Sequence, residues 1–335
     1  MLDVIICGAG VAGSRVAKML GDKIKYKIFD PGKIYLKDSG SVSAHIKDFF
    51  PKIKIERKIK KIIIRGEKNS ITFKRDKPFA YLINRISFWK MLRKGLDIEK
   101  ERILEVKQHK NFVSVKTNEN KYKAKLVVGA DGALSIVRRE LGIRANIYFG
   151  IFGFSKPKSN AYVVHFNKKF SNGFSWQIPN GEYGLITNNK FIKKSFEDFL
   201  SSINTKIKKY YSYPLPLGLQ KSYSRRVILV GDAASQIKPI TFGGIIYSLK
   251  AANIAARHIK NFLADEVNYN LKNYEDDWRK EFGDEIFFGS LFRKMYEAMP
   301  QKMIDLSISF MGNFKNKIES KDFDYDMMLR SVLKS

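Results

Sequence analysis

Three glycines near the N-terminus have the spacing of a diphosphate-binding turn. Gly8, Gly10 and Gly13 follow the apolar run 4–6 directly. The first glycine permits a tight turn, the second lets the backbone approach a pyrophosphate, and the third allows a helix to pack closely on the strand. A helix that begins here directs its free N–H groups and positive dipole end at the anion. We therefore predict nucleotide binding by this turn, including Val11 and Ala12.

A carboxylate follows the next predicted strand. Asp30 ends the segment 25–30, and Pro31 and Gly32 break the pattern after it. A carboxylate at this distance from the glycines accepts hydrogen bonds from the ribose hydroxyls of an adenine nucleotide. The alternative is that Asp30 only initiates the turn at Pro31. The functional interpretation places both Asp30 and Pro31 at the nucleotide.

A second glycine-containing segment lies in the middle of the chain. Asp131 and Gly132 follow the apolar strand 122–129, with Ser135 and Arg138 just after them. Taken alone, this is a strand that enters a helix capped by Asp131 or Ser135.

A third segment lies far along the chain and has a similar pattern. Gly231 and Asp232 end the apolar strand 226–231, and Gly243 and Gly244 open a long predicted helix over 243–263. Its position after a strand and before a helix matches that of the first two segments, so we expect the three to act together.

The order of these three segments resembles that in FAD-dependent oxidoreductases of the aromatic-hydroxylase type, which have the glutathione-reductase fold. The resemblance covers most of residues 1–265 and implies FAD as the cofactor, with Asp131 and Gly132 among the residues that bind it. It implies that Asp232 holds the ribityl chain, and that the helix near Gly243 and Gly244 directs its N-terminus at the flavin pyrimidine. Arg85 matches the arginine that opens the helix beside the cofactor; the alternative is a surface arginine in a basic chain.

Within that group the chain resembles the geranylgeranyl reductase family most. Phe174, Trp176 and Pro179 match its aromatic-x-Trp-x-(Phe/Ile)-Pro segment, which implies substrate contacts for these residues. The alternative is an aromatic stripe in the core of a sheet. The segment 271–283 also resembles the family sequence after the second nucleotide helix.

The loop 37–41 resembles the family's Lys-x-Cys-Gly-Gly loop beside the flavin, which implies that Ser39, Gly40 and Ser41 contact the cofactor. Ser39 replaces the usual cysteine and Ser41 replaces the second glycine, so thiol chemistry is absent from this loop. Phe174 also replaces a tyrosine, and Ile178 replaces a phenylalanine.

The resemblance implies a reductase that saturates C=C bonds of geranylgeranyl or polyprenyl chains in isoprenoid lipids or diphosphates, in the biosynthesis of archaeal-type membrane lipids. FAD carries the hydride chemistry and the protein supplies position and electrostatics. The proton donor is unassigned, with Ser39 and Tyr183 as weak catalytic candidates. An apolar slot is expected from the stretch 146–188 together with Phe287, Phe288, Leu291, Phe292 and Met295.

Two other functions fit the same fold. One is a FAD-dependent monooxygenase or halogenase, because 174–179 also resembles the Trp-x-Trp-x-Ile-Pro motif of flavin halogenases, although its first tryptophan is missing here. The other is a flavoprotein that binds a prenyl lipid without turning it over. No second GxGxxG segment is present, so the electron donor is either ferredoxin or a transiently bound NAD(P)H.

Hydrophobic periodicity indicates the elements that position these residues. We predict an α/β protein: an interrupted Rossmann-like FAD-binding domain, an inserted antiparallel β-sheet substrate domain and a C-terminal helical segment. The expected domains are 1–50, 79–145 and 218–268 for FAD, 51–78 and 146–217 for substrate, and 269–335 for the helices. The remaining expected strands are 2–7, 59–65, 70–75, 102–107, 111–116, 146–154, 161–167, 174–178 and 183–188, and the remaining helices are 11–20, 86–97, 191–206 and several in 270–335.

The chain is strongly basic. It has 62 Lys and Arg against 33 Asp and Glu, a formal charge of +29. This charge favours anionic partners such as lipid headgroups, phosphorylated substrates or an acidic ferredoxin; the alternative is a lysine-rich chain with solvated basic faces. Nucleic acid is not expected, because the lysines are spread along the chain and no reader motif is present.

Composition also indicates the compartment. The single cysteine, Cys7, excludes an intrachain disulfide and fits the reducing cytoplasm. The four histidines lack metal-ligand spacing, so no metal is expected. Neither a signal peptide nor an apolar run of about 18 residues is evident. We expect a cytoplasmic protein that can contact an anionic membrane peripherally.

Overall fold

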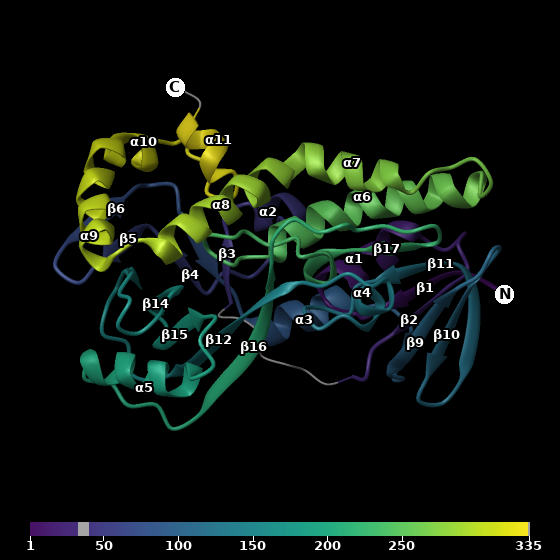
Figure 1. Ribbon diagram of the computed structural model, residues 1–335, viewed down its shortest axis with the longest axis horizontal. Coiled ribbons are helices and arrows are strands. Elements are labelled where there is room, and N and C mark those ends of the chain that lie inside the picture. Colours follow the sequence, from purple (N-terminus) through teal and green to yellow (C-terminus); the bar gives the residue numbers. More distant parts are fainter. Residues whose placement is uncertain (33–39, 334–335) are drawn as a thin grey trace. The chain divides into compact units, whose positions relative to one another are not determined.

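The computed structural model describes residues 1–32 and 40–333, and the chain divides into two compact units. The first unit contains Met1–Tyr35, Ile86–Asn146 and Pro216–Ser290, and the second contains Leu36–Arg85, Ile147–Leu215 and Leu291–Ser335. The segment 269–335, expected as one helical region, is therefore divided between the units after Ser290. Figure 1 labels the elements of both.

The first unit is built on a sheet whose strand order is β8-β2-β1-β11-β10-β9, with β17 pairing in parallel with β11. β1, β2, β8, β11 and β17 run parallel, whereas β9 and β10 are antiparallel additions. Residues 4–7 are fully buried, as expected for a central parallel strand covered on both faces. The bounds are β1 Leu2–Cys7, β2 Tyr26–Phe29, β8 Ile98–Glu99, β9 Ile103–Gln108, β10 Val113–Thr117, β11 Lys121–Gly129 and β17 Val227–Leu229.

Helices of the first unit connect these strands. α1 packs against α6, whose alanine-rich face is buried and permits close approach. The Arg15 Nε donates a hydrogen bond to the Asn253 Oδ1 across this contact, at 2.8 Å. The bounds are α1 Val11–Leu20, α3 Arg85–Arg93, α4 Ile136–Glu140, the 3-10 helix η1 Gly231–Ala234, α6 Ile245–Ala264, α7 Lys272–Trp278 and the π-helical turn η2 Arg279–Gly283. Helix α8, Asp284–Ala298, begins in the first unit, and its residues from Leu291 onward belong to the second.

The second unit contains a seven-stranded sheet in the order β16-β12-β15-β14-β13-β5-β6. The pairs β12–β15, β15–β14, β14–β13 and β5–β6 are antiparallel, whereas β13 and β5 pair in parallel. Helix α5, Ile192–Ser202, packs its apolar side on Ile151, Tyr183 and Leu185 of this sheet. The strand bounds are β5 Lys61–Arg65, β6 Ser70–Lys74, β12 Asn146–Phe154, β13 Tyr162–His165, β14 Phe174–Gln177, β15 Glu182–Thr187 and β16 Tyr210–Leu217.

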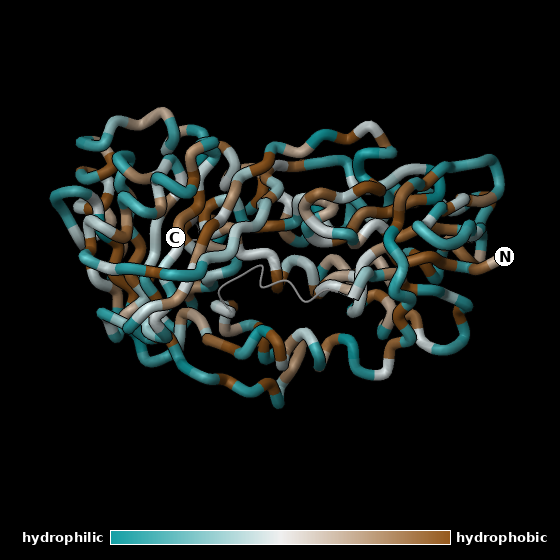
Figure 2. The backbone as a smooth tube through the Cα atoms, turned by 90° about the horizontal axis from the view of Figure 1, so that it is seen from below, coloured by the Kyte–Doolittle hydropathy of each residue, from teal (hydrophilic) through white to brown (hydrophobic). Residues whose placement is uncertain are grey.

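A small three-stranded sheet completes the second unit, in the order β3-β7-β4. The bounds of its strands and of the remaining helices are β3 Ser41–Ser43, β4 Arg57–Ile59, β7 Ala80–Leu82, α2 Ile46–Phe49, α9 Gln301–Phe310, η3 Met311–Phe314, α10 Lys315–Glu319 and α11 Met328–Leu333. Strands β3, β4, β7, β8 and β16 were not expected from the sequence. Figure 2 shows hydrophobic residues concentrated in the interior segments of each unit.

The structure confirms the expected α/β fold class, with a mostly parallel sheet, an inserted antiparallel sheet and C-terminal helices. Among the described residues, no helix combines the length and the apolar composition needed to cross a membrane.

Candidate functional site

The glycine turn after β1 is closely packed at two of its glycines and open at the third. Gly8 has φ +99°, and a Cβ there would lie 2.3 Å from the Ala130 carbonyl oxygen. A Cβ on Gly13 would lie 1.9 Å from the Gly8 carbonyl oxygen. A Cβ on Gly10 would meet no described atom within 4 Å. Gly8 and Gly13 are therefore required by packing, whereas Gly10 borders free space.

The N-terminus of α1 opens at that free space. Gly10 is the N-cap, and no side chain caps the helix there. The first N–H groups of a helix need an acceptor, and an anion supplies one. The turn, with Val11 and Ala12 in the first helical positions, therefore fits the diphosphate of a dinucleotide.

Asp30 is held in place at the end of β2. Its Oδ2 accepts a hydrogen bond from the Ala9 N–H at 3.0 Å, and its Oδ1 accepts one from the Gly32 N–H at 2.9 Å. The Arg93 guanidinium lies 3.2 Å from the Oδ1 and 4.0 Å above the Trp89 ring. The carboxylate thus links the glycine turn to α3, and it also starts the turn at Pro31. Sequence reasoning missed Arg93; its spacing of four residues from Trp89 on a helix was the available signal.

The mid-chain segment acts as a helix cap. Asp131 Oδ2 accepts hydrogen bonds from the Ile136 and Val137 N–H groups at 2.6 and 3.2 Å. The Ser135 Oγ accepts one from the Arg138 N–H at 2.9 Å. Both of the expected caps are therefore present. Desolvation raises the pKa of Asp131, and the hydrogen bonds from Ser135 and the backbone oppose that rise.

Arg138 joins this cap to the third glycine segment. Its guanidinium donates hydrogen bonds to the Ala133 carbonyl oxygen, to that of Ala233 at 3.1 Å and to that of Asp232 at 3.3 Å. Gly132, with φ +81°, provides the turn that precedes this cap. The segment around Asp131 and Gly132 therefore holds η1 in position, a structural role that was not predicted, and the expected contact of these two residues with the cofactor stays a prediction.

Asp232 lies at the N-terminus of α6. A Cβ on Gly244 would lie 3.1 Å from the Asp232 Oδ1, and one on Gly243 would lie 3.0 Å from the Lys238 Cε. Gly231 has φ +69°, and a Cβ there would lie 2.9 Å from the Ala12 Cβ. The third glycine segment thus touches α1 directly. The structure brings together the predicted residues of the first unit: two helix N-termini and two strand-terminal carboxylates.

The loop before β3 belongs to the second unit. Ser39 lies outside the described residues. Gly40 has φ +69°, and a Cβ there would lie 2.5 Å from the Ile83 carbonyl oxygen and 3.2 Å from the Arg85 Cγ. Ser41 begins β3 and pairs with Leu82 of β7. Gly40, Ser41 and Arg85 therefore lie together, although nothing in the sequence predicted the small sheet that joins them.

The predicted substrate residues lie in the core of the second unit. Trp176 is buried, and its Nε1–H donates a hydrogen bond to the Glu182 Oε1 at 2.7 Å. A Cβ on Gly184, the residue paired with Trp176, would lie 2.0 Å from the indole. The Phe174 ring lies 5.8 Å from the Trp176 ring, and the Pro179 carbonyl oxygen accepts a hydrogen bond from Arg57 at 3.2 Å.

Tyr183 lies on the other face of the same sheet. It pairs with Gln177, so its side chain is out of phase with that of Trp176. Its ring belongs to the cluster beneath α5, and its hydroxyl donates a hydrogen bond to the Lys156 carbonyl oxygen at 2.7 Å. Burial raises the pKa of Tyr183. These contacts give Tyr183 a core role and separate it from the aromatic segment 174–179 by the thickness of the sheet.

The apolar residues of α8 that were expected at a substrate slot are half-exposed. Phe287, Phe288, Leu291, Phe292 and Met295 are each between 44% and 54% exposed. Their place in such a slot stays a prediction.

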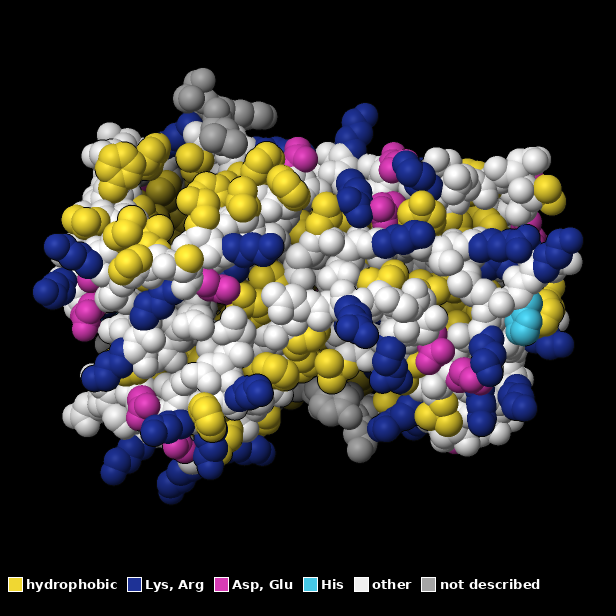
Figure 3. Space-filling view, in the orientation of Figure 1, with side chains coloured by type: hydrophobic (Ala, Val, Ile, Leu, Met, Phe, Trp, Pro, Cys, Tyr) yellow, Lys and Arg dark blue, Asp and Glu magenta, His cyan; other side chains and the backbone are white. Residues whose placement is uncertain are grey.

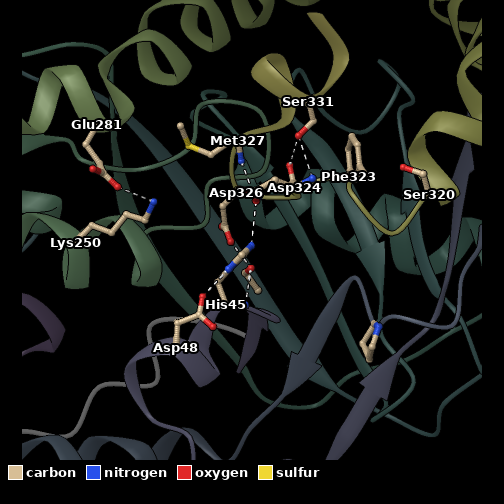
Figure 4. A network of polar contacts seen from close by, with 12 residues as sticks. His45, Asp48, Lys250, Glu281, Ser320, Phe323, Asp324, Asp326, Met327 and Ser331 are labelled. Carbon is tan, nitrogen blue, oxygen red and sulfur yellow. Dashed lines mark hydrogen bonds and ion pairs between the residues drawn. The ribbon is translucent and has the colours of Figure 1, made fainter. Parts of the chain in front are cut away.

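A histidine in the second unit binds the C-terminal segment (Figure 4). The His45 Nε2 lies 3.2 Å from the Asp324 Oδ1, and its Nδ1 lies 2.7 Å from the Asp48 Oδ2. The hydrogen bond with Asp324 raises the pKa of His45 to about 9. Burial alone would raise the pKa of Asp324, but hydrogen bonds from His45 and from backbone N–H groups lower it to about 2. His45, Asp324 and Asp326 offer ligand-type atoms within 4.8 Å of one another, and the ion pair accounts for that approach of His45 to Asp324.

Comparison with known proteins identifies relatives among archaeal reductases. No family model matches the chain. It is 30% identical to an uncharacterised protein of Methanocaldococcus jannaschii, over 63% of this chain and 60% of that protein. It is 28% identical to digeranylgeranylglycerophospholipid reductase 1 of Methanococcoides burtonii, over 60% and 55%. It is 24% identical to the digeranylgeranylglycerophospholipid reductase of M. jannaschii, over 96% and 93%. The first two alignments thus span less than two thirds of the relatives' own length.

Solved structures share the fold over nearly the whole chain. A geranylgeranyl bacteriochlorophyll reductase-like protein of Thermoplasma acidophilum superposes with a TM-score of 0.85 at 18% identity, over 99% of this chain and 96% of that one. A flavin-dependent brominase superposes with a TM-score of 0.71 at 15% identity, over 100% and 99%. The chain is thus similar in sequence to archaeal digeranylgeranylglycerophospholipid reductases, and it shares the fold of these solved structures.

Proposed function

We propose that this protein is a FAD-dependent reductase that saturates C=C bonds in the geranylgeranyl chains of isoprenoid lipids or prenyl diphosphates. The observation that carries the proposal is the arrangement in the first unit. Gly10 borders free space at the uncapped N-terminus of α1, and Asp232 lies at the N-terminus of α6, which packs on α1. The names of the archaeal relatives support the substrate class.

The residues of the first unit fit FAD in three places. The N–H groups of Val11, Ala12 and Gly13 would bind the diphosphate, because the N-cap residue, Gly10, has no side chain that could accept hydrogen bonds from them. Asp30 would accept hydrogen bonds from the adenosine ribose, since Ala9, Gly32 and Arg93 already fix its orientation. Asp232 would hold the ribityl chain, within the turn that Arg138 fixes.

Bound FAD would supply the hydride chemistry, and the protein would supply electrostatics and position. The N-terminus of α6, with Gly243 and Gly244, would stabilise negative charge at the flavin pyrimidine. We also propose Gly40, Ser41 and Arg85 as contacts of the cofactor. Phe174, Trp176 and Pro179 would shape the apolar substrate site; the hydrogen bond from Trp176 to Glu182 keeps that ring in one orientation.

The proposal includes the surroundings of the enzyme. We place it in the cytoplasm, in peripheral contact with an anionic membrane, since its formal charge is +29. Its electrons would come from ferredoxin or NAD(P)H. The basic surface would suit an acidic donor such as ferredoxin.

Replacement of Gly10 tests the cofactor site. Gly10→Val adds bulk only to the free space at α1, so we expect a folded protein that loses the flavin absorption spectrum. Gly312→Val is the matched control, because a Cβ there would meet only Ile71, at 3.9 Å. A colourless wild-type protein that takes up no added FAD would overturn the proposal.

The reaction is tested with the reduced wild-type protein. Anaerobic incubation with a geranylgeranyl lipid should add one H₂ for each saturated double bond, measured by lipid mass spectrometry. An unchanged lipid with fully reduced flavin contradicts the reductase assignment. A C4a-adduct spectrum on addition of oxygen would support a monooxygenase instead.

A further inference from the structure

The second unit exposes an apolar face on two helices. We define this apolar face as six residues, each 50% to 61% exposed: Leu291, Phe292 and Met295 of α8, with Met303, Leu306 and Phe310 of α9. Figure 3 shows hydrophobic side chains gathered over α8, α9 and α10, with Lys and Arg side chains beside them. Contiguous exposed apolar side chains of this size mark interaction surfaces.

The inner side of α9 fixes which residues face outward. Ile304, Asp305 and Ile308 are buried. The Asp305 Oδ1 accepts hydrogen bonds from the Glu67 and Lys68 N–H groups at 2.8 and 3.2 Å. A Cβ on Gly66 would lie 1.9 Å from that same oxygen, so the β5–β6 turn fits the carboxylate closely. Rotation of α9 would break these contacts, and the outward position of Leu306 and Phe310 is therefore set by the fold.

Acidic groups of the segment 291–319 are turned toward the protein. This segment contains three: Asp305, Glu297 and Glu319. Asp305 caps the β5–β6 turn, Glu297 accepts a hydrogen bond from the Tyr148 hydroxyl, and Glu319 accepts one from the Lys74 N–H at 2.6 Å.

Three lysines of the same segment face solvent instead, whereas Arg293 is buried. Lys294 of α8, Lys302 of α9 and Lys315 of α10 are exposed. The outer surface around the apolar face is therefore cationic, with aromatic and aliphatic side chains at its centre. Two copies of such a face would bring like charges together across a two-fold axis. An anionic bilayer can bind both parts of this surface, because its acyl chains accept the apolar centre and its headgroups attract the lysines.

We propose that the apolar face docks on the surface of an anionic lipid bilayer, with Met303, Leu306 and Phe310 entering the boundary of the acyl chains and the lysines contacting headgroup phosphates. The proposal deepens the suggested membrane contact by naming its surface. Only the purpose of this docking rests on the proposed function: docking would bring the enzyme to a lipid substrate in the bilayer. Binding itself needs neither flavin nor substrate.

Vesicle co-sedimentation of the full chain tests this docking. Wild-type protein should sediment with vesicles of phosphatidylglycerol and phosphatidylcholine, and much less with phosphatidylcholine alone. The double variant Leu306→Ser/Phe310→Ser should bind at least about tenfold more weakly, because two apolar side chains no longer leave water. Phe191→Ser is the matched control: Phe191 is 72% exposed beside α5 and should bind like wild type.

The charge contribution is tested separately. Lys294→Gln/Lys302→Gln should weaken binding roughly fivefold for each lysine lost. Lys193→Gln/Lys194→Gln, on the exposed side of α5, should have little effect. Equal losses for the two pairs would show a general charge effect and overturn the assignment to this face.

Two further outcomes contradict the proposal. Wild-type protein that fails to bind anionic vesicles excludes the bilayer as the occupant. A concentration-dependent dimer that Leu306→Ser/Phe310→Ser abolishes, measured by light scattering, would assign the face to a second copy. Flavin content and reduction of a detergent-dispersed lipid are measured on the same samples, so failure of docking is distinguished from failure of the reductase activity.

Discussion

Helices α5 and α9 both cover parts of the second unit, but they are built in opposite ways. α5 buries Phe196, Phe199 and Leu200 and exposes charged residues such as Glu197. α9 buries a carboxylate, Asp305, and exposes Leu306 and Phe310.

This difference shows that the two helices are attached to the second unit by different kinds of interaction. α5 is held by an apolar cluster, and its outer side needs only water. α9 is held by the hydrogen bonds of Asp305 to the β5–β6 turn together with its two buried isoleucines, and its outer side carries large apolar side chains. A helix with this arrangement buries less apolar surface within its own unit, and its large exposed side chains are available for contact with a partner.

The largest expected difference between the two helices comes from replacing one phenylalanine of each helix with alanine. Phe199→Ala should lower the free energy of unfolding by about 3–5 kcal/mol, because it opens a cavity between α5 and the sheet. Phe310→Ala should change it by less than about 0.5 kcal/mol, because the side chain is exposed. Urea unfolding followed by circular dichroism measures both. Equal losses would mean that Phe310 is part of a packed core.

The next test concerns the buried carboxylate. Asp305→Ala should cost about 2–3 kcal/mol, because the Glu67 and Lys68 N–H groups lose a charged acceptor. Asp198→Ala, on the exposed side of α5, is the control and should stay within about 0.5 kcal/mol of wild type. If Asp305→Ala unfolds like the control, then α9 is held by its isoleucines instead.

The smallest effect is a pH dependence that follows from the polar attachment of the segment beyond α9. The pKa of His45 is raised from 6.5 to about 9, so its stabilising ion pair is complete below pH 6.5 and is lost as the pH rises through about 9. Since His45 is partly exposed, solvent screening reduces the contribution to about 1 kcal/mol. Thermal melting of wild type and His45→Gln should differ at neutral pH and converge above about pH 9. A constant difference across that range would exclude the titration of His45 as its source.

Asp324 acts at the opposite end of the pH scale. Its pKa is lowered from 3.8 to about 2, so its contribution is present above pH 3.8 and is lost as the pH falls through about 2. The ion pair between His45 and Asp324 therefore stabilises the C-terminal segment most between about pH 3.8 and pH 6.5.

Local patterns predicted the elements of the first unit well. Residues 2–7 and 11–20 form a strand and a helix with the expected bounds, because an apolar run and a glycine turn leave few alternatives. Strand β16 was missed because Pro214 and Pro216 argue against a strand. It lies at the edge of its sheet, where a residue without an N–H is tolerated.

The contacts of the candidate site were less predictable than its motifs. The pairing of Arg93 with Asp30 and the clamp made by Arg138 depend on the tertiary arrangement of distant segments. The half-exposure of the apolar side chains of α8 could not be predicted, because hydrophobicity does not tell whether a side chain meets the core or an outside partner.

The contact between α1 and α6 has a consequence for how the protein is made. The hydrogen bond between Arg15 and Asn253 joins residues 238 positions apart. At a synthesis rate of roughly 5–20 residues per second, the ribosome needs about 12–48 s to make the chain between them. During that time the apolar side of α1 has no partner helix. The N-terminal glycine turn and α1 are therefore translated first, but their packing is completed only after α6 has been made.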